Sequence, residues 1–160
     1  MLITENGTGL ANADSYISVE DASDYLDARV HDDRWSNLDQ TAQERYLRAA
    51  TSYIDTMFNH AGSRASSEQN LAYPRQGHSS VPRAVQNATA LLAYESVTTA
   101  LYASVNDQKV LSESLLDGMT ETTYFAPITE HRFPAVEAML ADVATFKKAS
   151  GITVTRIVRD

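Results

Sequence analysis

The chain has 160 residues, 43% of them hydrophobic, which suits a single domain with its own core. It contains no cysteine, which excludes disulfides and cysteine-ligated zinc, and it shows neither a leader peptide nor an apolar run near the roughly 20 residues that span a bilayer, so we expect a soluble protein. The net charge of −8, without a cluster of Lys and Arg, argues against tight binding to a phosphate backbone.

The acidic residues are concentrated near the N-terminus. Residues 1–39 hold nine acidic and two basic residues, and the rest of the chain is almost neutral. Two interpretations are open for this segment. It is either a solvated acidic helix face that aids solubility or a surface along which DNA passes without being held.

Two helices are predicted in the first part of the chain. Ser18 can cap a short helix that extends to about Val30, because acidic residues follow it and apolar residues recur at helical spacing. A second helix is expected from near Thr41, with Glu44 in the capping-box position, and Gly62 is a plausible stop. The apolar stripe of this second helix comprises Tyr46, Leu47, Ala50, Tyr53, Ile54, Met57 and Phe58.

A loop marked by proline and glycine residues separates the second helix from the third. Residues 63–80 are rich in Ser, Gly and Asn, and Pro74 favours an extended conformation at Tyr73. Pro82 is suited to the first turn of a helix that we expect to reach about Val105. Since this third helix is apolar over much of its circumference, it should be buried by several neighbours, in its own fold or across subunits.

After the third helix, the helical spacing of apolar residues gives way to β-prone runs. Asp117-Gly118 lies between two β-prone runs, which predicts a hairpin at about 109–126. A last helix is expected from near Pro134, with Gly151 as its stop.

Together these elements predict a mainly α fold: a small helical bundle of about four helices with a β-hairpin and an extended C-terminal tail. We expect one domain over residues 1–160, with a helical core at about 18–150 and a docking tail at 151–160. The tail is β-branched, so it either pairs within its own fold or adds a strand to a partner.

No catalytic or metal-binding motif emerges from the sequence. The four histidines lack zinc-site spacing, and neither a phosphate-binding glycine loop nor a nucleophile elbow is present. His31 beside Asp32 and Asp33 fits an exposed polar turn better than a metal fragment. The eight tyrosines fit core or subunit packing better than base stacking. We therefore predict a protein that is not an enzyme and that needs no metal and no cofactor.

An ordered set of short motifs over residues 7–125 carries a family resemblance. The set comprises Gly9-Leu10-Ala11-Asn12-Ala13-Asp14-Ser15-Tyr16-Ile17-Ser18, Ala22 with Asp24-Tyr25-Leu26, Trp35, Arg48-Ala49-Ala50-Thr51, Tyr53-Ile54-Asp55, and Gln69…Leu71-Ala72-Tyr73-Pro74-Arg75…Gly77…Val81-Pro82. It resembles a family of small tailed-bacteriophage proteins that carry the label "putative DnaT-like single-stranded-DNA-binding protein". The structural picture of that family is a head–tail adaptor, or connector. The family often has Trp at the position of Tyr73.

The resemblance implies a structural virion protein that joins the portal at the capsid vertex to the neck and tail and lines the DNA exit channel. Its partners would be further copies of itself in a homo-oligomeric, twelvefold ring, the portal protein, and the next neck or tail-completion protein. Genomic DNA would pass through without specific binding, and no membrane would be contacted. The location would be the head–tail junction of the virion, after assembly in the host cytoplasm.

The partner contacts are expected in the loop and the tail. The acidic segment suits a channel wall, and the β-prone tail suits strand addition to another protein. The predicted partner-binding residues are Tyr73, Pro74, Arg75, Ile152, Val154, Arg156, Ile157 and Arg159.

Two alternatives belong to other functional classes. The first is a replication accessory protein that binds single-stranded DNA; its sequence support is the number of aromatic residues, and a salt-sensitive affinity for oligonucleotides would identify it. The second is a small enzyme with an unmarked site, which would require a pocket with convergent polar groups.

Overall fold

The computed structural model describes residues 1–102, 110–116, 119–124 and 133–147, the hairpin residues by their backbone alone. The chain divides into two compact units, Met1–Tyr102 with Phe133–Lys147, and Ala103–Arg132 with Lys148–Asp160. The expected organisation as one domain, with a core at 18–150, stays a prediction. The expected tail at 151–160 lies outside the described residues.

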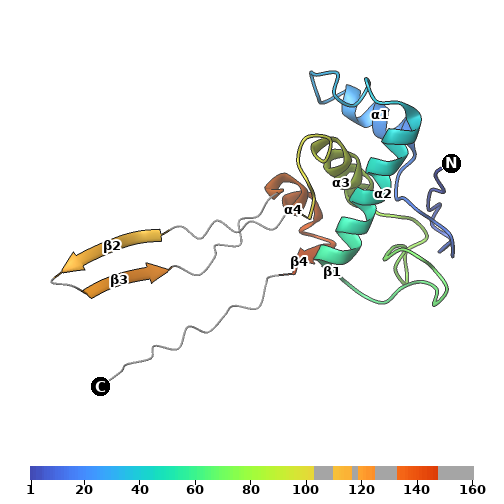
Figure 1. The fold of residues 1–160 in the computed structure, drawn as a ribbon. Coiled ribbons are helices and arrows are strands. Elements are labelled where there is room, and N and C mark those ends of the chain that lie inside the picture. The colour runs from blue at the N-terminus through green and yellow to red at the C-terminus, as the bar shows by residue number, and fades with distance from the viewer. Residues whose placement is uncertain (103–109, 117–118, 125–132, 148–160) are drawn as a thin grey trace. The chain divides into compact units, whose positions relative to one another are not determined.

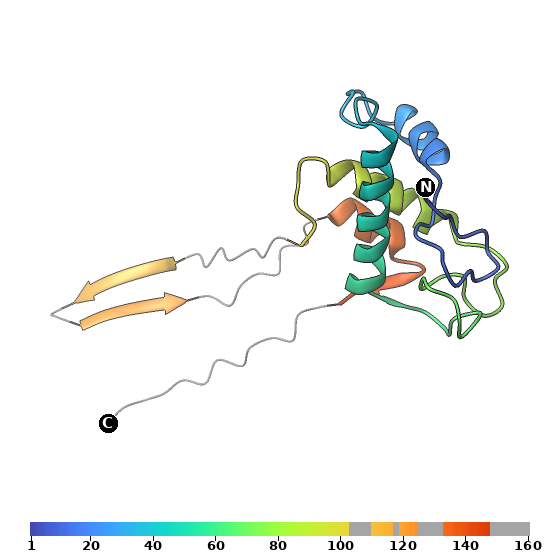
Figure 2. The ribbon, with the colours of Figure 1, turned by 45° about the vertical axis from the view of Figure 1, so that its right-hand side comes forward.

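The described residues form a mainly helical fold, as predicted. The helices are α1 (Val19–Asp27), α2 (Gln40–Met57), α3 (Arg83–Glu95) and α4 (Pro134–Leu140). The longest helix, α2, packs against α3, which also contacts α1 and α4 (Figure 1). In Figure 2, α2 runs steeply across α3. None of the described helices is long and apolar enough to cross a bilayer.

The predicted stripe of α2 forms the centre of the core. Leu47, Ala50 and Ile54 are completely buried, and they share the core with Val85 and Leu92 of α3. Burying such aliphatic side chains contributes roughly 1.5–3 kcal/mol each to folding, before entropy costs are counted. The amphipathic pattern of this helix is therefore a reliable guide to its packing.

The start of α2 differs from the predicted one. Asp39 is the N-cap, and its carboxylate accepts a hydrogen bond from the Ala42 amide at 2.7 Å. Glu44 does not close a capping box with Thr41; its carboxylate lies 3.5 Å from the guanidinium of Arg48, one turn further on. Aspartate caps as well as threonine does, and here it comes two residues earlier in the chain.

The third helix is shorter than predicted, because α3 ends at Glu95 and not near Val105. The residues that follow compete for its last carbonyls. The Ser96 hydroxyl donates to the Ala93 carbonyl at 2.6 Å, and the Thr98 hydroxyl faces the Glu95 carbonyl at 3.5 Å. Side chains of this type favour turns over the continuation of a helix.

The last helix is also shorter than predicted. It ends at Leu140, and Phe146 lies in a strand, β4 (Ala144–Phe146), antiparallel to β1 (Phe58–His60). Phe146 is the partner of Phe58, and their rings meet edge to face at 5.3 Å. Aromatic cross-strand pairing thus overrides the helical spacing.

The predicted hairpin is present in the second unit. Strands β2 (Val110–Leu116) and β3 (Met119–Tyr124) are antiparallel, and Leu116 is the partner of Met119. The two residues between the strands are Asp117 and Gly118, the pair on which the prediction rested.

The N-terminal segment folds around a buried carboxylate. Glu5, only 3% exposed, accepts hydrogen bonds from the amides of Gly7 (2.8 Å), Gly9 (3.0 Å) and Leu10 (2.8 Å). Gly7 has a φ of 96°, and a Cβ built there would lie 2.3 Å from the Ser79 carbonyl oxygen. Only glycine permits this close approach, which sets the N-terminal segment against the loop before α3.

Candidate nucleic-acid interface

The loop between β1 and α3, residues 61–80, is organised around one buried side chain. Gln69, 2% exposed, accepts from the Ser66 amide at 2.9 Å and donates to the carbonyls of Leu71 (2.8 Å) and Pro74 (3.1 Å). A buried amide that satisfies three backbone groups makes the loop conformation costly to change. Residues 61–80 are called the glutamine-centred loop below.

A second network ties this loop to α2. The Asp55 carboxylate accepts hydrogen bonds from the Tyr16 hydroxyl and from the Ala72 amide, the latter at 2.9 Å. The Tyr16 oxygen also accepts from the Ala72 and Tyr73 amides, at 2.9 and 3.3 Å. The loop is therefore tied to the core by the hydrogen bonds of Ala72 and Tyr73 to Tyr16 and Asp55.

Burial dominates the electrostatics of this network. It raises the pKa of the Asp55 carboxyl, although the hydrogen bonds from Tyr16 and Ala72 and the charges of Arg64 and Arg75 act in the opposite direction. Burial, reinforced by the neighbouring Asp55 charge, raises the pKa of the Tyr16 hydroxyl far above its ordinary value. Tyr16 therefore stays a neutral donor.

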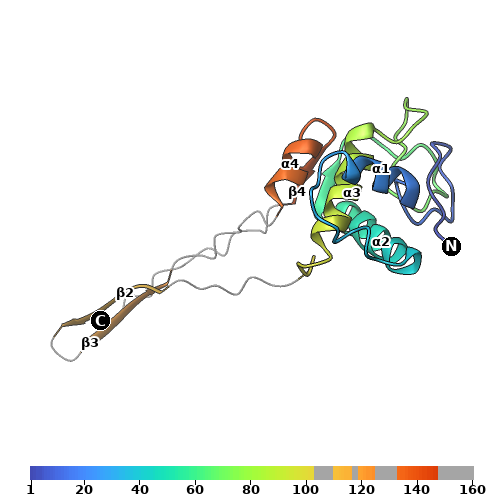
Figure 3. The same ribbon diagram turned by 90° about the horizontal axis from the view of Figure 1, so that it is seen from above.

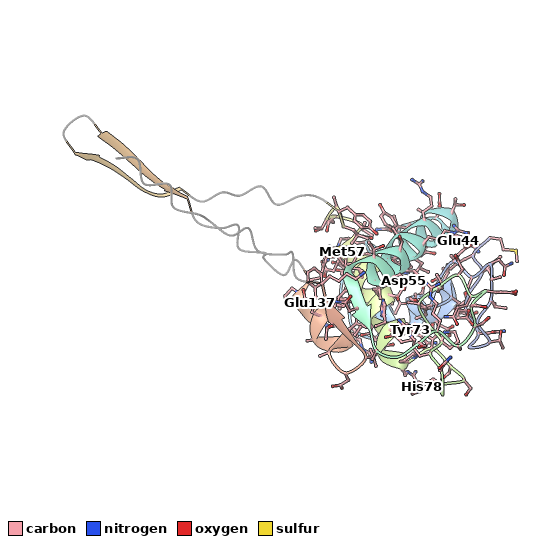
Figure 4. The ribbon with its side chains drawn as sticks, turned by 90° about the horizontal axis from the view of Figure 1, so that it is seen from below. Glu44, Asp55, Met57, Tyr73, His78 and Glu137 are labelled. Atoms are coloured by element: carbon pink, nitrogen blue, oxygen red, sulfur yellow. The ribbon has the colours of Figure 1, made fainter. Side chains whose placement is uncertain are left out.

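The structure places the three predicted loop residues differently from one another. Tyr73 and Pro74, joined by a cis peptide bond, are buried, while Arg75 is half-buried. The Tyr73 hydroxyl donates to the Val143 carbonyl at 3.0 Å, and its ring meets those of Tyr16 and His60 edge to face. In Figure 4, which is seen from below, Tyr73 lies between Asp55 and His78.

The predicted tail residues Ile152, Val154, Arg156, Ile157 and Arg159 lie outside the described residues. A partner contact by these residues or by the loop stays a prediction.

Two arginines face each other across the glutamine-centred loop. Arg64 and Arg75 are direct partners in an antiparallel bridge, flanked by the backbone bonds Ala65 N–Pro74 O (3.1 Å) and Gln76 N–Ser63 O (2.9 Å). Like charges directly opposite each other destabilise such a pair. This adjacency depends on the loop fold, because ten residues lie between the two arginines in the sequence.

Neither guanidinium is fully engaged. Arg75 donates from Nη1 to the Gly62 carbonyl at 3.2 Å, but its buried Nε has no hydrogen-bond partner in the described part of the chain. Arg64 makes one long contact, 3.5 Å from its Nη1 to the Gln69 carbonyl. Because the Arg75 Nε is buried, the N–H donors that an anion can reach are chiefly those of the exposed Arg64.

The positive charge of Arg75 also acts on the nearby side chain of His60. Burial, followed by the positive charge of Arg75, lowers the pKa of His60 from 6.5 to about 4, and Lys147 acts in the same direction. Lys147 donates from Nζ to the Thr56 carbonyl at 2.7 Å, at the end of α2. Glu68 is the single acidic residue of the loop sequence, so residues 61–80 carry a net positive charge, although the Asp55 carboxylate of α2 lies against the loop.

The acidic charge of the sequence is distributed unevenly in the structure. Glu5 is buried on backbone amides, and Asp14 pairs with Arg48 at 3.3 Å. Exposed carboxylates lie along α1, at Glu20, Asp24 and Asp27 among others, but also outside it, and Glu68 of the loop is exposed too. A count over the sequence therefore overstates the repulsion that a phosphate meets at the loop.

The tyrosines and the possible metal fragment can now be placed. Tyr16, Tyr53, Tyr73 and Tyr94 are buried, as predicted, whereas Tyr102 is 58% exposed. Asp32 accepts from the Tyr94 hydroxyl at 2.7 Å and pairs with Arg34 at 2.8 Å, and the bond from Tyr94 lowers the pKa of the Asp32 carboxyl. Within the described ranges, no three His, Asp or Glu side chains come together as metal ligands.

Comparison with known proteins identifies one family. Residues 1–160 match the model of the family described as "Putative DnaT-like ssDNA binding protein". Searches of curated proteins and of solved structures find no match.

This finding corrects the interpretation as a head–tail adaptor. The family description names binding to single-stranded DNA, whereas we expected a ring bound to the portal and neck with DNA passing unbound. The adaptor interpretation came from the structural picture attached to the family resemblance, and the acidity of the sequence was taken as its support, although part of that acidic charge is buried or paired. The expected location in the virion followed from the same interpretation and has not been tested. The chain belongs to the family of putative DnaT-like ssDNA-binding proteins.

Proposed function

We propose that this chain binds single-stranded DNA, as its family description states, and that Arg64 and Arg75 contact the phosphate backbone. The observation that carries the proposal is the facing pair of arginines in a locally positive loop. An anion between two guanidinium groups would relieve their mutual repulsion and accept hydrogen bonds from both.

The loop has the polar groups that phosphate contacts normally use. Besides its two arginines, its sequence holds Ser63, Ser66 and Ser67, and hydroxyl and backbone N–H groups commonly contact phosphate oxygens. The hydrogen bonds of Gln69 hold the backbone in place beforehand, so less entropy is lost on binding.

The size of the patch favours a short, modest interaction. Two phosphate contacts on a single strand correspond to a slope of about −1.4 in a plot of log K against log salt. The carboxylates of α1 should repel a backbone that strays from the loop. We therefore propose a binding role of limited affinity, in agreement with the lack of catalytic motifs in the sequence.

Fluorescence anisotropy with a dye-labelled oligo(dT) tests the proposal. Binding should weaken with rising salt, and the double variant Arg64→Ala/Arg75→Ala should lose about tenfold or more in affinity and flatten the salt slope. Arg45→Ala is the matched control, because Arg45 is an exposed arginine of α2 outside the loop. Absence of binding at low salt, or equal losses in the loop and control variants, would contradict the proposal.

A further inference from the structure

A second surface of the same unit has the features of a ligand site. A groove of about 460 Å³ lies between α1 and α3, which Figure 3 shows side by side. Its volume is within the range of roughly 300–1,000 Å³ that small-molecule sites occupy. The polar side chains that line it are Asp21, Asp24, Tyr25, Arg29, Arg83, Gln86 and Asn87. We refer to it as the α1–α3 groove.

One wall of the α1–α3 groove is flat. The Arg29 guanidinium lies 4.1 Å from the centroid of the Tyr25 ring, and its Nη1 donates to the Tyr25 carbonyl at 3.2 Å. Arg29 is an exposed residue. A planar guanidinium held over an aromatic ring is a surface on which another planar group can stack.

The opposite wall offers hydrogen bonds. The amides of Gln86 and Asn87 are half-buried, and no hydrogen bond engages them within the described part of the chain. Each amide carries two N–H donors and a carbonyl acceptor. Half-buried amides without partners suit a ligand whose edge has both donors and acceptors, as the edge of a nucleobase has.

The charge of the α1–α3 groove excludes a phosphate as its main ligand. Two carboxylates, Asp21 and Asp24, balance the two guanidinium groups of Arg29 and Arg83. Asp21 also accepts from the Ser18 hydroxyl at 2.6 Å, which holds its carboxylate on this side of α1. With no net charge, the groove favours a neutral, planar ligand.

We infer that the α1–α3 groove is a base subsite, which receives one nucleobase of the strand whose phosphates contact Arg64 and Arg75. The inference rests on the proposed function. Arg83 is the first residue of α3 and follows the glutamine-centred loop directly, so loop and groove are consecutive along the chain (Figure 1). The base stacks against Tyr25 and Arg29 and presents its edge to Gln86 and Asn87.

Base and phosphate contacts have different signatures, and this difference makes the subsite testable. Loss of a phosphate contact lowers the salt slope and weakens all sequences alike. Loss of a stacking contact lowers affinity without changing the salt slope, by roughly tenfold per base. The Tyr25→Leu variant should therefore bind oligo(dT) about tenfold more weakly, with the salt slope of the wild type.

Three controls accompany this variant. Tyr25→Phe keeps the ring and should bind as the wild type does, which separates stacking from any fault in folding. Tyr46→Leu removes another half-buried tyrosine, on α2, and should leave binding unchanged. An abasic oligonucleotide of equal length should bind the wild type and Tyr25→Leu equally well.

A measurement without DNA strands separates this inference from the proposed function. Free thymidine monophosphate at millimolar concentration should shift the side-chain NH₂ signals of Gln86 and Asn87 in NMR spectra of the wild type, and not in Tyr25→Leu. Unshifted signals, or wild-type oligonucleotide affinity in Tyr25→Leu while the loop variants are weakened, would overturn the subsite and leave the function standing. No oligonucleotide binding by the wild type would instead overturn the function itself.

Discussion

The glutamine-centred loop and helix α1 belong to the same unit and have opposite chemistry. The loop has two arginines facing each other and one glutamate, whereas α1 has four acidic residues and no basic one. The loop is held by hydrogen bonds from buried polar groups, and α1 by the burial of Ala22 and Leu26. The comparison shows that the net charge of a chain does not predict the charge of any one of its surfaces. Binding at a site depends on the charges close to it.

We expect the largest loss of stability when the hydrogen-bond network of Tyr16 and Asp55, which ties the loop to α2, is broken. Tyr16→Phe removes the hydroxyl that bonds Asp55 and lies near the Ala72 and Tyr73 amides. Leaving the half-buried carboxyl and an amide short of partners should cost about 3 kcal/mol in the free energy of unfolding. Urea denaturation measures this loss. A change below 1 kcal/mol would mean that the network contributes little to stability.

A smaller effect should follow from Gln69→Ala, which removes the side chain at the centre of the loop. Three backbone groups lose a bond, but the loop is near solvent and water can replace part of them, so we expect a loss of about 2 kcal/mol. The variant should also weaken oligonucleotide binding, because Arg64 and Arg75 are no longer held in register. Urea denaturation and fluorescence anisotropy measure the two effects; full affinity with the stability reduced would contradict the link between loop order and binding.

The histidine beneath the loop predicts a dependence of stability on pH. The pKa of His60 is about 4 in the folded protein, against 6.5 ordinarily, so the unfolded chain binds the proton more readily between these values. Stability is therefore lost as pH falls from about 6.5 towards 4. Arg75 and Lys147 are the charges that oppose protonation.

Comparison of the wild type with His60→Gln isolates this contribution. We expect about 1 kcal/mol, because the partly exposed ring is screened by solvent. Urea unfolding at pH 6.5 and pH 4.5 provides the measurement. His78→Gln, at an exposed position in the loop, is the control. An equal pH dependence in the wild type and His60→Gln would refute the assignment.

We expect the smallest effect, a change in affinity for DNA, when exposed carboxylates of α1 are neutralised. Glu20→Gln with Asp27→Asn removes two exposed carboxylates outside the α1–α3 groove. Weaker repulsion should raise the affinity for oligo(dT) about threefold at low salt, and the gain should shrink at physiological salt. Anisotropy measures both. Asp142→Asn, an exposed carboxylate beyond α4, should change the affinity much less.

The sequence predicts those features that depend on neighbours along the chain. The stripe of α2, the cap at Ser18 and the Asp117-Gly118 hairpin are local patterns, and each is present in the structure. The ends of α2, α3 and α4 were predicted wrongly: α2 ends at Met57, so Phe58 of its predicted stripe lies in β1, and turn-forming hydroxyls and the distant pairing of Phe58 with Phe146 decide these ends.

The candidate sites lie beyond such local patterns. Arg64 and Arg75 become neighbours only through the fold of the loop, and the α1–α3 groove joins segments about sixty residues apart. Sequence reasoning assigned Tyr25 to the core and gave Arg64, Gln86 and Asn87 no role. The grouping of Arg75 with the fixed loop was the one signal that pointed to the interface.

The carboxylate of Glu5 illustrates a last consequence of this architecture. Three amides of a glycine-rich turn surround it, which is how many proteins grip a phosphate or sulfate group. Here the bound anion is the carboxylate of Glu5 itself. Its hydrogen bonds shape the N-terminal segment, in which Gly7 packs against Ser79. Shortening the Glu5 side chain would leave three amide donors without their acceptor, so in engineering terms this buried carboxylate is a position at which the chain should tolerate little change.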